Sequence, residues 1–182
     1  NSYQSSVYGG GIFNGSGSPI IQNNTFSGNS ATGSYQQSSY GGGIYNDSGS
    51  PIIQNNTFSG NSATGSSNYY SSDGGGISNG SGSPTIQNNT FSANSANYHG
   101  GGISNGSGSP TIQNNTFSSN SAYSGGGIYN GSGSPTIQNN TFSANSAGYG
   151  GGIYNGSGGS GSPTIQDNIF QGNSAGYGGG IY

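Results

Sequence analysis

One unit of about 25 residues is written six times along the chain, and this repetition constrains the fold more than any other feature. The unit reads GGGIYNGSGSPTIQNNTFSxNSA, and an unfinished seventh copy follows. The isoleucines that close the Gly-Gly-Gly runs are separated by 32, 33, 26, 25, 25 and 28 residues. A period in this range indicates similar supersecondary units that bury their apolar residues against their neighbours in a stack.

Each unit contains three short extended pieces, and each piece carries one main apolar residue between polar neighbours. This alternation is typical of strands with one buried face, whereas the Gly and Pro of every unit disfavour helix. We therefore predict an all-β fold, a parallel β-helix, as a three-sided solenoid with about 25 residues per turn, six full turns and part of a seventh. The predicted core columns are Ile12, Ile44, Ile77, Ile103, Ile128, Ile153 and Ile181; Ile21, Ile53, Ile86, Ile112, Ile137 and Ile165; and Phe26, Phe58, Phe91, Phe117, Phe142 and Phe170.

Asparagines recur at the predicted corners, as Asn23, Asn24 and Asn29 do in the first unit. Asparagine tolerates the left-handed conformation and can hydrogen-bond an identical residue one turn above. We expect inward ladders of amides at these corners.

Length variation falls mainly in corner inserts over residues 32–40 and 64–73. A loop can leave a solenoid at a corner without disturbing the stack, so we expect a single β-solenoid domain over residues 1–182, as part of a longer repeat protein. The inserts are the predicted place for any specific recognition.

Composition excludes most functions that depend on charge. The 182 residues include no Lys, no Arg and no Cys. Nucleic-acid binding needs cations against phosphates, and a β-helix enzyme needs a basic residue or paired carboxylates. Asp47, Asp73 and Asp167 lie in different units, and the single histidine, His99, is expected at the surface without a partner. We expect no enzyme, no cofactor, no metal site, no nucleic-acid partner and no direct membrane insertion.

The motif Phe-x-x-Asn occurs in six units, beginning at Phe26 in the first. Together with Gly-Gly-Gly-Ile it resembles the repeats of polymorphic outer-membrane proteins and related bacterial autotransporter passengers. Those repeats combine Gly-Gly-Ala and an aliphatic residue with Phe-x-x-Asn, so the third glycine departs from their pattern. The resemblance covers nearly the whole chain and implies a right-handed parallel β-helix exposed on a cell surface, often in adhesion.

Two columns of Asn-x-Ser/Thr motifs predict glycosylation of a secreted rod or, with more support, ordinary turn chemistry. The candidate glycosylation sites are Asn14, Asn46, Asn79, Asn105, Asn130 and Asn155. The second column is Asn23, Asn55, Asn88, Asn114 and Asn139.

Outward tyrosines can stack on sugars or pack against a neighbouring rod, and the sequence does not separate these uses. The candidate surface contacts are Tyr35, Tyr45, Tyr69, Tyr70, Tyr129 and Tyr154. Threonine columns that include Thr25 and Thr85 are a feature of ice-binding surfaces, although Gln22 and its equivalents break one of these planes.

We therefore expect a secreted or cell-surface structural protein that forms or extends a fibre, sheath or adhesin stalk by β-solenoid stacking. Its expected partner is itself, as a homopolymer or by lateral association, because a surface with almost no charge lacks repulsion between copies. The alternative is a monomeric module that binds surface glycans or ice.

Overall fold

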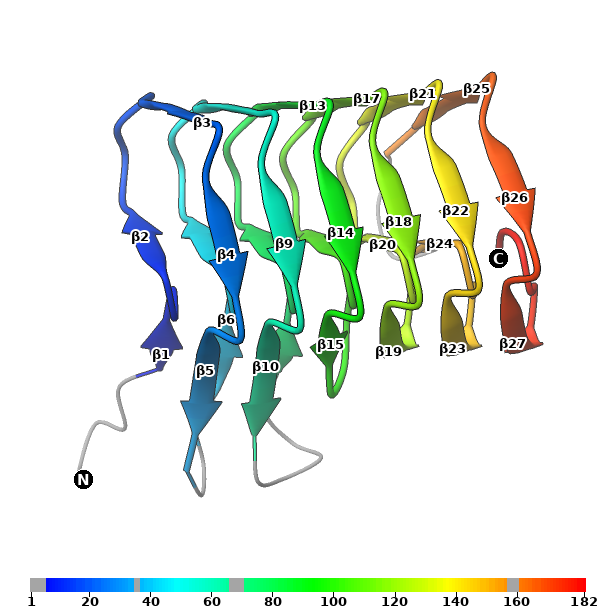
Figure 1. Cartoon of the computed structure of the whole chain (residues 1–182), viewed down its shortest axis with the longest axis horizontal. Coiled ribbons are helices and arrows are strands. Elements are labelled where there is room, and N and C mark those ends of the chain that lie inside the picture. Colours follow the sequence, from blue (N-terminus) through cyan, green and yellow to red (C-terminus); the bar gives the residue numbers. More distant parts are fainter. Residues whose placement is uncertain (1–5, 35–36, 66–70, 157–160) are drawn as a thin grey trace.

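The computed structural model describes residues 6–34, 37–65, 71–156 and 161–182, and in it the chain winds into a stack of parallel strands (Figure 1). These residues form four six-stranded sheets and one three-stranded sheet, with no helix among them. Strands of one turn pair with strands of the next turn, and the described pairings are all parallel. The predicted all-β parallel solenoid is confirmed.

The first and second sheets follow the Gly-Gly-Gly run and the proline of each unit. The first sheet contains β2 (Ile12–Asn14), β7 (Ile44–Asn46), β12 (Ile77–Asn79), β16 (Ile103–Asn105), β20 (Ile128–Asn130) and β24 (Ile153–Asn155). The second sheet contains β3 (Ile20–Gln22), β8 (Ile52–Gln54), β13 (Thr85–Gln87), β17 (Thr111–Gln113), β21 (Thr136–Gln138) and β25 (Thr164–Gln166).

The third and fourth sheets complete each turn. The third contains β4 (Thr25–Ser27), β9 (Thr57–Ser59), β14 (Thr90–Ser92), β18 (Thr116–Ser118), β22 (Thr141–Ser143) and β26 (Ile169–Gln171). The fourth contains β5 (Ser30–Gly33), β10 (Ser62–Gly65), β15 (Ser95–Ala96), β19 (Ser121–Ser124), β23 (Ser146–Tyr149) and β27 (Ser174–Tyr177). The sequence predicted three strands per turn and missed the fourth, because its inward residue is only an alanine.

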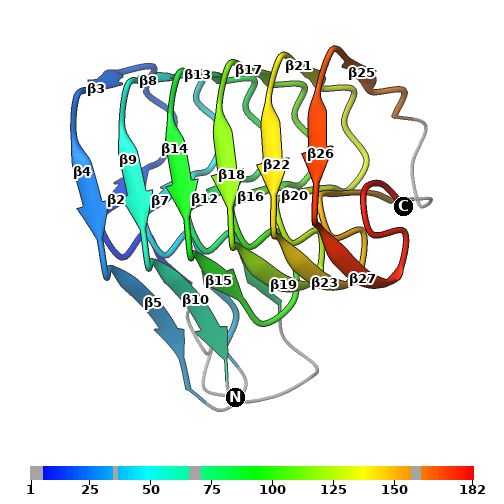
Figure 2. The same cartoon turned by 45° about the vertical axis from the view of Figure 1, so that its right-hand side comes forward.

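The strands pair each residue with its own equivalent one turn away. Ile12 lies opposite Ile44, which lies opposite Ile77, although 32 and 33 residues separate them. The described residues on either side of these inserts lie at one corner of the stack (Figure 2). The described parts of the inserts extend the sheets rather than forming loops throughout: β5 and β10 continue into them, and a three-stranded sheet adds β1 (Val7–Tyr8), β6 (Ser39–Tyr40) and β11 (Ser72–Asp73).

The core consists of two isoleucine columns and one phenylalanine column. The rings from Phe26 to Phe170 stack with centroids 4.7–4.9 Å apart and planes 4–6° apart. Most predicted core residues are fully buried, but Ile12, Ile165 and Phe170 are only partly so. Ile181 is 44% exposed, because its row has a neighbouring strand on one side only.

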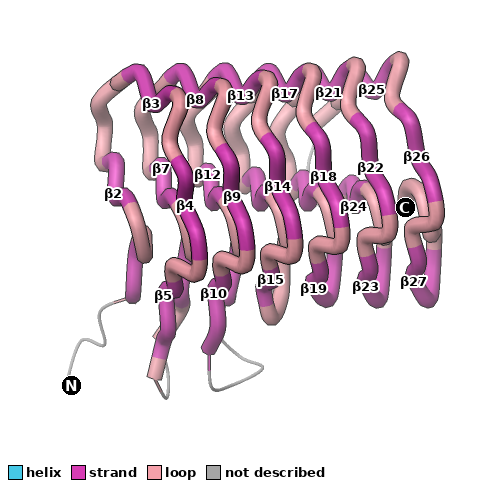
Figure 3. The backbone as a smooth tube through the Cα atoms, viewed as in Figure 1, coloured by secondary structure: helices cyan, strands magenta, loops and turns pink. Residues whose placement is uncertain are grey.

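The corners repeat from turn to turn (Figure 3) and are lined inside by asparagine ladders. The expectation of inward amides is confirmed for the Asn24 and Asn29 columns and wrong for the Asn23 column, which is exposed. Asn94 is typical: its Nδ2 donates to the carbonyl of Phe58 and to Oδ1 of Asn120, both at 3.0 Å. Two ladders follow this geometry: Asn24, Asn56, Asn89, Asn115, Asn140 and Asn168; and Asn29, Asn61, Asn94, Asn120, Asn145 and Asn173.

The Gly-Gly-Gly corner requires glycine for close approach. A Cβ atom on Gly75 would lie 2.4 Å from the carbonyl oxygen of Ser95. Gly74, just before it, has a φ of 72°, which other residues rarely adopt. The first sheet can therefore begin directly beside the fourth.

Candidate functional site

Two columns of side chains flank the Gly-Gly-Gly corner, and together we call them the aromatic corner. The first column directly precedes each run: Tyr8, Tyr40, Asp73, His99, Ser124, Tyr149 and Tyr177. The second follows each Gly-Gly-Gly-Ile element: Phe13, Tyr45, Ser78, Ser104, Tyr129, Tyr154 and Tyr182. Aromatic residues thus occupy both ends of the stack, and polar residues interrupt them in the middle.

Four rings form a cluster over the first two turns. Tyr8 lies 5.6 Å from Tyr40 and 4.9 Å from Tyr45 between ring centroids, and Phe13 lies 5.7 Å from Tyr45. The hydroxyl of Tyr45 donates a hydrogen bond of 3.1 Å to Oδ1 of Asp47. Burial raises the pKa of Tyr45 well above its usual range, and the Asp47 carboxylate raises it further.

A tyrosine ladder runs along the later turns. Tyr129 and Tyr154 have centroids 5.2 Å apart with planes at 7°, and Tyr154 stacks on Tyr182 at 5.4 Å. Parallel rings cover one another's faces, so the ladder presents mainly ring edges and hydroxyl groups to solvent. Stacking on a sugar needs an uncovered ring face, and the rings inside the ladder do not offer one. Glycan binding through Tyr45, Tyr129 and Tyr154 stays a prediction. Of the other candidate contacts, Tyr35, Tyr69 and Tyr70 lie outside the described residues.

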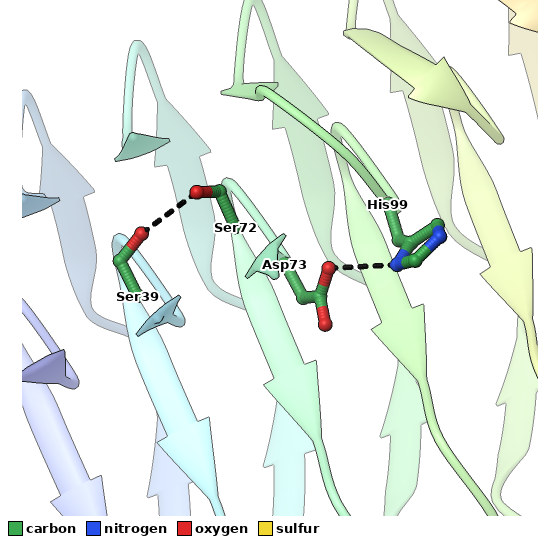
Figure 4. A network of polar contacts seen from close by, with 4 residues as sticks. All are labelled: Ser39, Ser72, Asp73 and His99. Carbon is green, nitrogen blue, oxygen red and sulfur yellow. Dashed lines mark hydrogen bonds and ion pairs between the residues drawn. The ribbon is translucent and has the colours of Figure 1, made fainter. Parts of the chain in front are cut away.

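A contact between a histidine and a carboxylate lies in the polar middle of the aromatic corner (Figure 4). Nδ1 of His99 is 2.8 Å from Oδ1 of Asp73, and the two side chains are 25% and 15% exposed. The expectation that His99 has no partner was wrong. Both residues directly precede a Gly-Gly-Gly run, so alignment of the repeats places them one turn apart and could have revealed the pair.

The histidine fills the space where the second column lacks rings. Ser78 and Ser104 replace aromatic residues there, yet each is only 4% exposed. The His99 ring stacks on Tyr129 with a centroid distance of 4.0 Å, much as an aromatic residue at position 104 would. Burial raises the pKa of Tyr129, and electrostatic interactions with Tyr154 and Asp73 raise it further.

The Asp73–His99 pair has no serine nucleophile beside it. Ser72 points away from Asp73, is 1% exposed, and its Oγ is hydrogen-bonded to Oγ of Ser39 at 3.1 Å (Figure 4). Across the described ranges no serine hydroxyl bonds to His99, and no three His, Cys, Asp or Glu side chains gather as metal ligands. The geometry is that of a packed surface contact, and the non-catalytic assignment stays a prediction.

The structure places the candidate glycosylation sites on the inside of the first corner. Asn46, Asn79, Asn105 and Asn130 are at most 1% exposed. The Nδ2 of Asn46, which would carry a glycan, donates to the carbonyl of Gly49 and to Oδ1 of Asn79, both at 2.7 Å. The Nδ2 of Asn14 is engaged in the same way, and Asn155 accepts from Asn130. The folded chain therefore contradicts glycosylation at the four buried sites.

The second column of motifs has the opposite orientation. Asn23, Asn55, Asn88, Asn114 and Asn139 are exposed and have φ values of 55–58°. The sequence motif is the same in both columns, so orientation could be assigned only from the fold.

These observations define a parallel β-solenoid with an aromatic corner. The chain belongs to a known family: the model described as "Right handed beta helix region" matches residues 38–182. The model of the Chlamydia polymorphic membrane protein repeat matches residues 25–47, so the resemblance inferred from Gly-Gly-Gly-Ile and Phe-x-x-Asn is confirmed. Comparisons with curated proteins and with solved structures give no match. Over the described residues, no helix has the length and apolar character needed to cross a membrane.

Proposed function

We propose that the chain is a structural, stalk-like segment of a secreted or cell-surface protein that forms or extends a fibre or sheath. The observation that carries the proposal is the register, in which equivalent repeat positions stack on one another through four sheets. The match to a repeat of a Chlamydia membrane protein supports the surface location.

Such a stack resists bending, because bending it would open hydrogen bonds on one side in several sheets at once. The asparagine ladders add side-chain hydrogen bonds between the same turns, for example from Asn61 to Asn94 at 2.9 Å. A segment of this kind holds an attached domain at a fixed distance.

Lateral association of such rods follows from their lack of charge. The net charge is −3 over 182 residues, with no Lys or Arg. Surfaces with so little charge do not repel one another and tend to associate. The proposed partner is therefore a second copy, packed side by side.

Electron microscopy of the purified chain tests both parts of the proposal. We expect straight rods that gather into bundles, with an axial diffraction spacing of about 4.8 Å. Flexible or compact particles would overturn the stalk. Discrete rods at every concentration would leave the stalk but overturn the association.

A charged variant identifies the cause of bundling. Thr85→Lys, Thr111→Lys and Thr136→Lys together place a row of positive charge on the second sheet, and we expect rods without bundles. The same three positions changed to Ser are the control and should bundle like the parent chain. Bundling that is equal in both variants would show that charge does not govern association.

A further inference from the structure

The outward face of the third sheet is a regular array of hydroxyl groups. In β4, β9, β14, β18 and β22 the two outward residues are one Thr and one Ser, on either side of the inward Phe. The threonine column is Thr25, Thr57, Thr90, Thr116 and Thr141, and the serine column is Ser27, Ser59, Ser92, Ser118 and Ser143. The array ends at β26, where Ile169 and Gln171 take these places.

This face is nearly flat. Neighbouring strands are ordinarily rotated by about 20–25°, but β4, β9, β14, β18, β22 and β26 run side by side with nearly the same direction (Figure 1). The hydroxyl groups therefore form a plane lattice, with repeats of about 4.8 Å along the stack and about 6.6 Å along each strand. The repeat along the stack is close to the distance between equivalent oxygen atoms along the basal axis of hexagonal ice, whereas the repeat along each strand is shorter than the axial one.

The threonine hydroxyls are available for such a lattice. Over the described residues, none of the five has a hydrogen-bond partner within the chain. The second sheet differs, because its outward glutamines bond to one another, as Gln54 does to Gln22 at 2.8 Å. In the fourth sheet the hydroxyls of Ser62 and Ser30 also bond to each other. Within the serine column of the array, the hydroxyl of Ser59 donates to that of Ser27 at 3.2 Å, so the threonine column is the one whose hydroxyls are all available.

Small residues border the array on one side. That edge is lined by Gly28, Gly60, Ala93, Ser119 and Ala144, all at positive φ. The other edge carries the exposed, uncharged asparagines of the Asn23 column. No bulky side chain rises above the plane in the five Thr-Phe-Ser rows, so a flat solid can meet the hydroxyl groups directly.

We propose that the third sheet binds ice. Each threonine presents a methyl group, which orders the adjoining water, beside a hydroxyl that can take a lattice position. The face has no charge with which to hold an ionic surface, and it carries no ring of the kind that stacks on sugars in polysaccharide-binding sites. This function goes beyond the structural role, and neither depends on the other.

Measurements of thermal hysteresis and ice-crystal shape on the purified chain test the proposal. We expect a freezing point below the melting point, with faceted crystals. The double variant Thr90→Tyr and Thr116→Tyr raises two rings above the plane of the third sheet and should abolish both effects. The matched control, Thr85→Tyr and Thr111→Tyr, changes the second sheet in the same turns and should keep them. Circular dichroism verifies that both variants remain folded.

Three outcomes would overturn ice binding. The parent chain could give no hysteresis and round crystals at its solubility limit. The two double variants could lose activity equally, which would show that the third sheet is not special. The chain could instead sediment with crystalline cellulose or chitin and leave ice unaffected, which would assign the lattice to a polysaccharide surface.

Discussion

The residue before the asparagine of Phe-x-x-Asn has a positive φ in all six units, whatever its side chain. Glycine occupies this place at Gly28, Gly60 and Gly172, with φ of 60–64°, but Ala93 and Ala144 adopt 53°. An L-residue in this conformation costs about 1–2 kcal/mol. The alanines therefore hold a conformation that their own preference opposes.

Replacing an alanine at this position tests that cost. Ala93→Gly should raise the free energy of unfolding by about 0.5–1 kcal/mol, because relief of the strain exceeds the added freedom of the unfolded chain. Denaturant titration measures the change. Gly60→Ala is the reverse control and should lower stability, since a Cβ there meets nothing within 4 Å and only φ is affected. Unchanged stability in both variants would contradict the argument.

Single residues also mark the limit of what the sequence could predict at the candidate site. The Asn14 and Asn23 columns share one motif, yet the Asn14 column faces inward and the Asn23 column is exposed. The contact between His99 and Asp73 depends on which residues stack one turn apart, and this could be read from the repeat once it was aligned. The sequence could not predict that the tyrosine rings cover one another's faces, because this depends on side-chain rotamers.

Each asparagine ladder links the turns along the stack, since its interior members both donate and accept. Asn94 also receives hydrogen bonds from the backbone and side-chain nitrogens of Asn61, at 3.0 and 2.9 Å. Removing its side chain takes the acceptor from the backbone and side-chain nitrogens of Asn61 and the Nδ2 donor from the carbonyl of Phe58, all on the preceding turn, whereas Oδ1 of Asn120 keeps a bond from the Asn94 backbone nitrogen. Loss of a buried partner is more costly than the net gain from one hydrogen bond.

The variant Asn94→Leu should therefore lower the free energy of unfolding by about 3–4 kcal/mol. Asn88→Gly, in the same turn, is the matched control and should shift it by less than about 0.5 kcal/mol, because glycine also accepts the left-handed conformation. Thermal and denaturant unfolding followed by circular dichroism compare the two. Similar losses would show that the ladder is not a major source of stability.

The strands were predictable to different degrees for physical reasons. Regular spacing of Ile and Phe predicts the first three sheets and their register, because each carries a large apolar residue. The fourth sheet buries only small residues such as Ala63 and has no comparable signal. The described parts of the inserts became strands because the neighbouring turn offers an edge to pair with.

At the scale of the whole molecule, length is set by the number of turns. A second copy of residues 128–152, inserted after Gly152, supplies one complete 25-residue turn, since Ile128 pairs with Ile153. Small-angle scattering should show a rod longer by about 4.8 Å, and the melting temperature should not fall. A glycine- and serine-rich insert of the same length is the control and should give a loop without lengthening. A lower melting temperature with the duplicated turn would contradict additive stacking.

The near identity of the turns has a consequence for how the chain finds its native pairing. A strand displaced by a whole turn still pairs Ile with Ile, Phe with Phe and Asn with Asn. Those columns therefore stabilise stacking but do not select which turns pair. The Asp73–His99 contact joins one particular pair of neighbouring turns, and the paired β6 and β11 strands bring together the two longest units. These irregular contacts distinguish the native pairing of turns from pairings displaced by a whole turn. They therefore fix the register of the turns on either side.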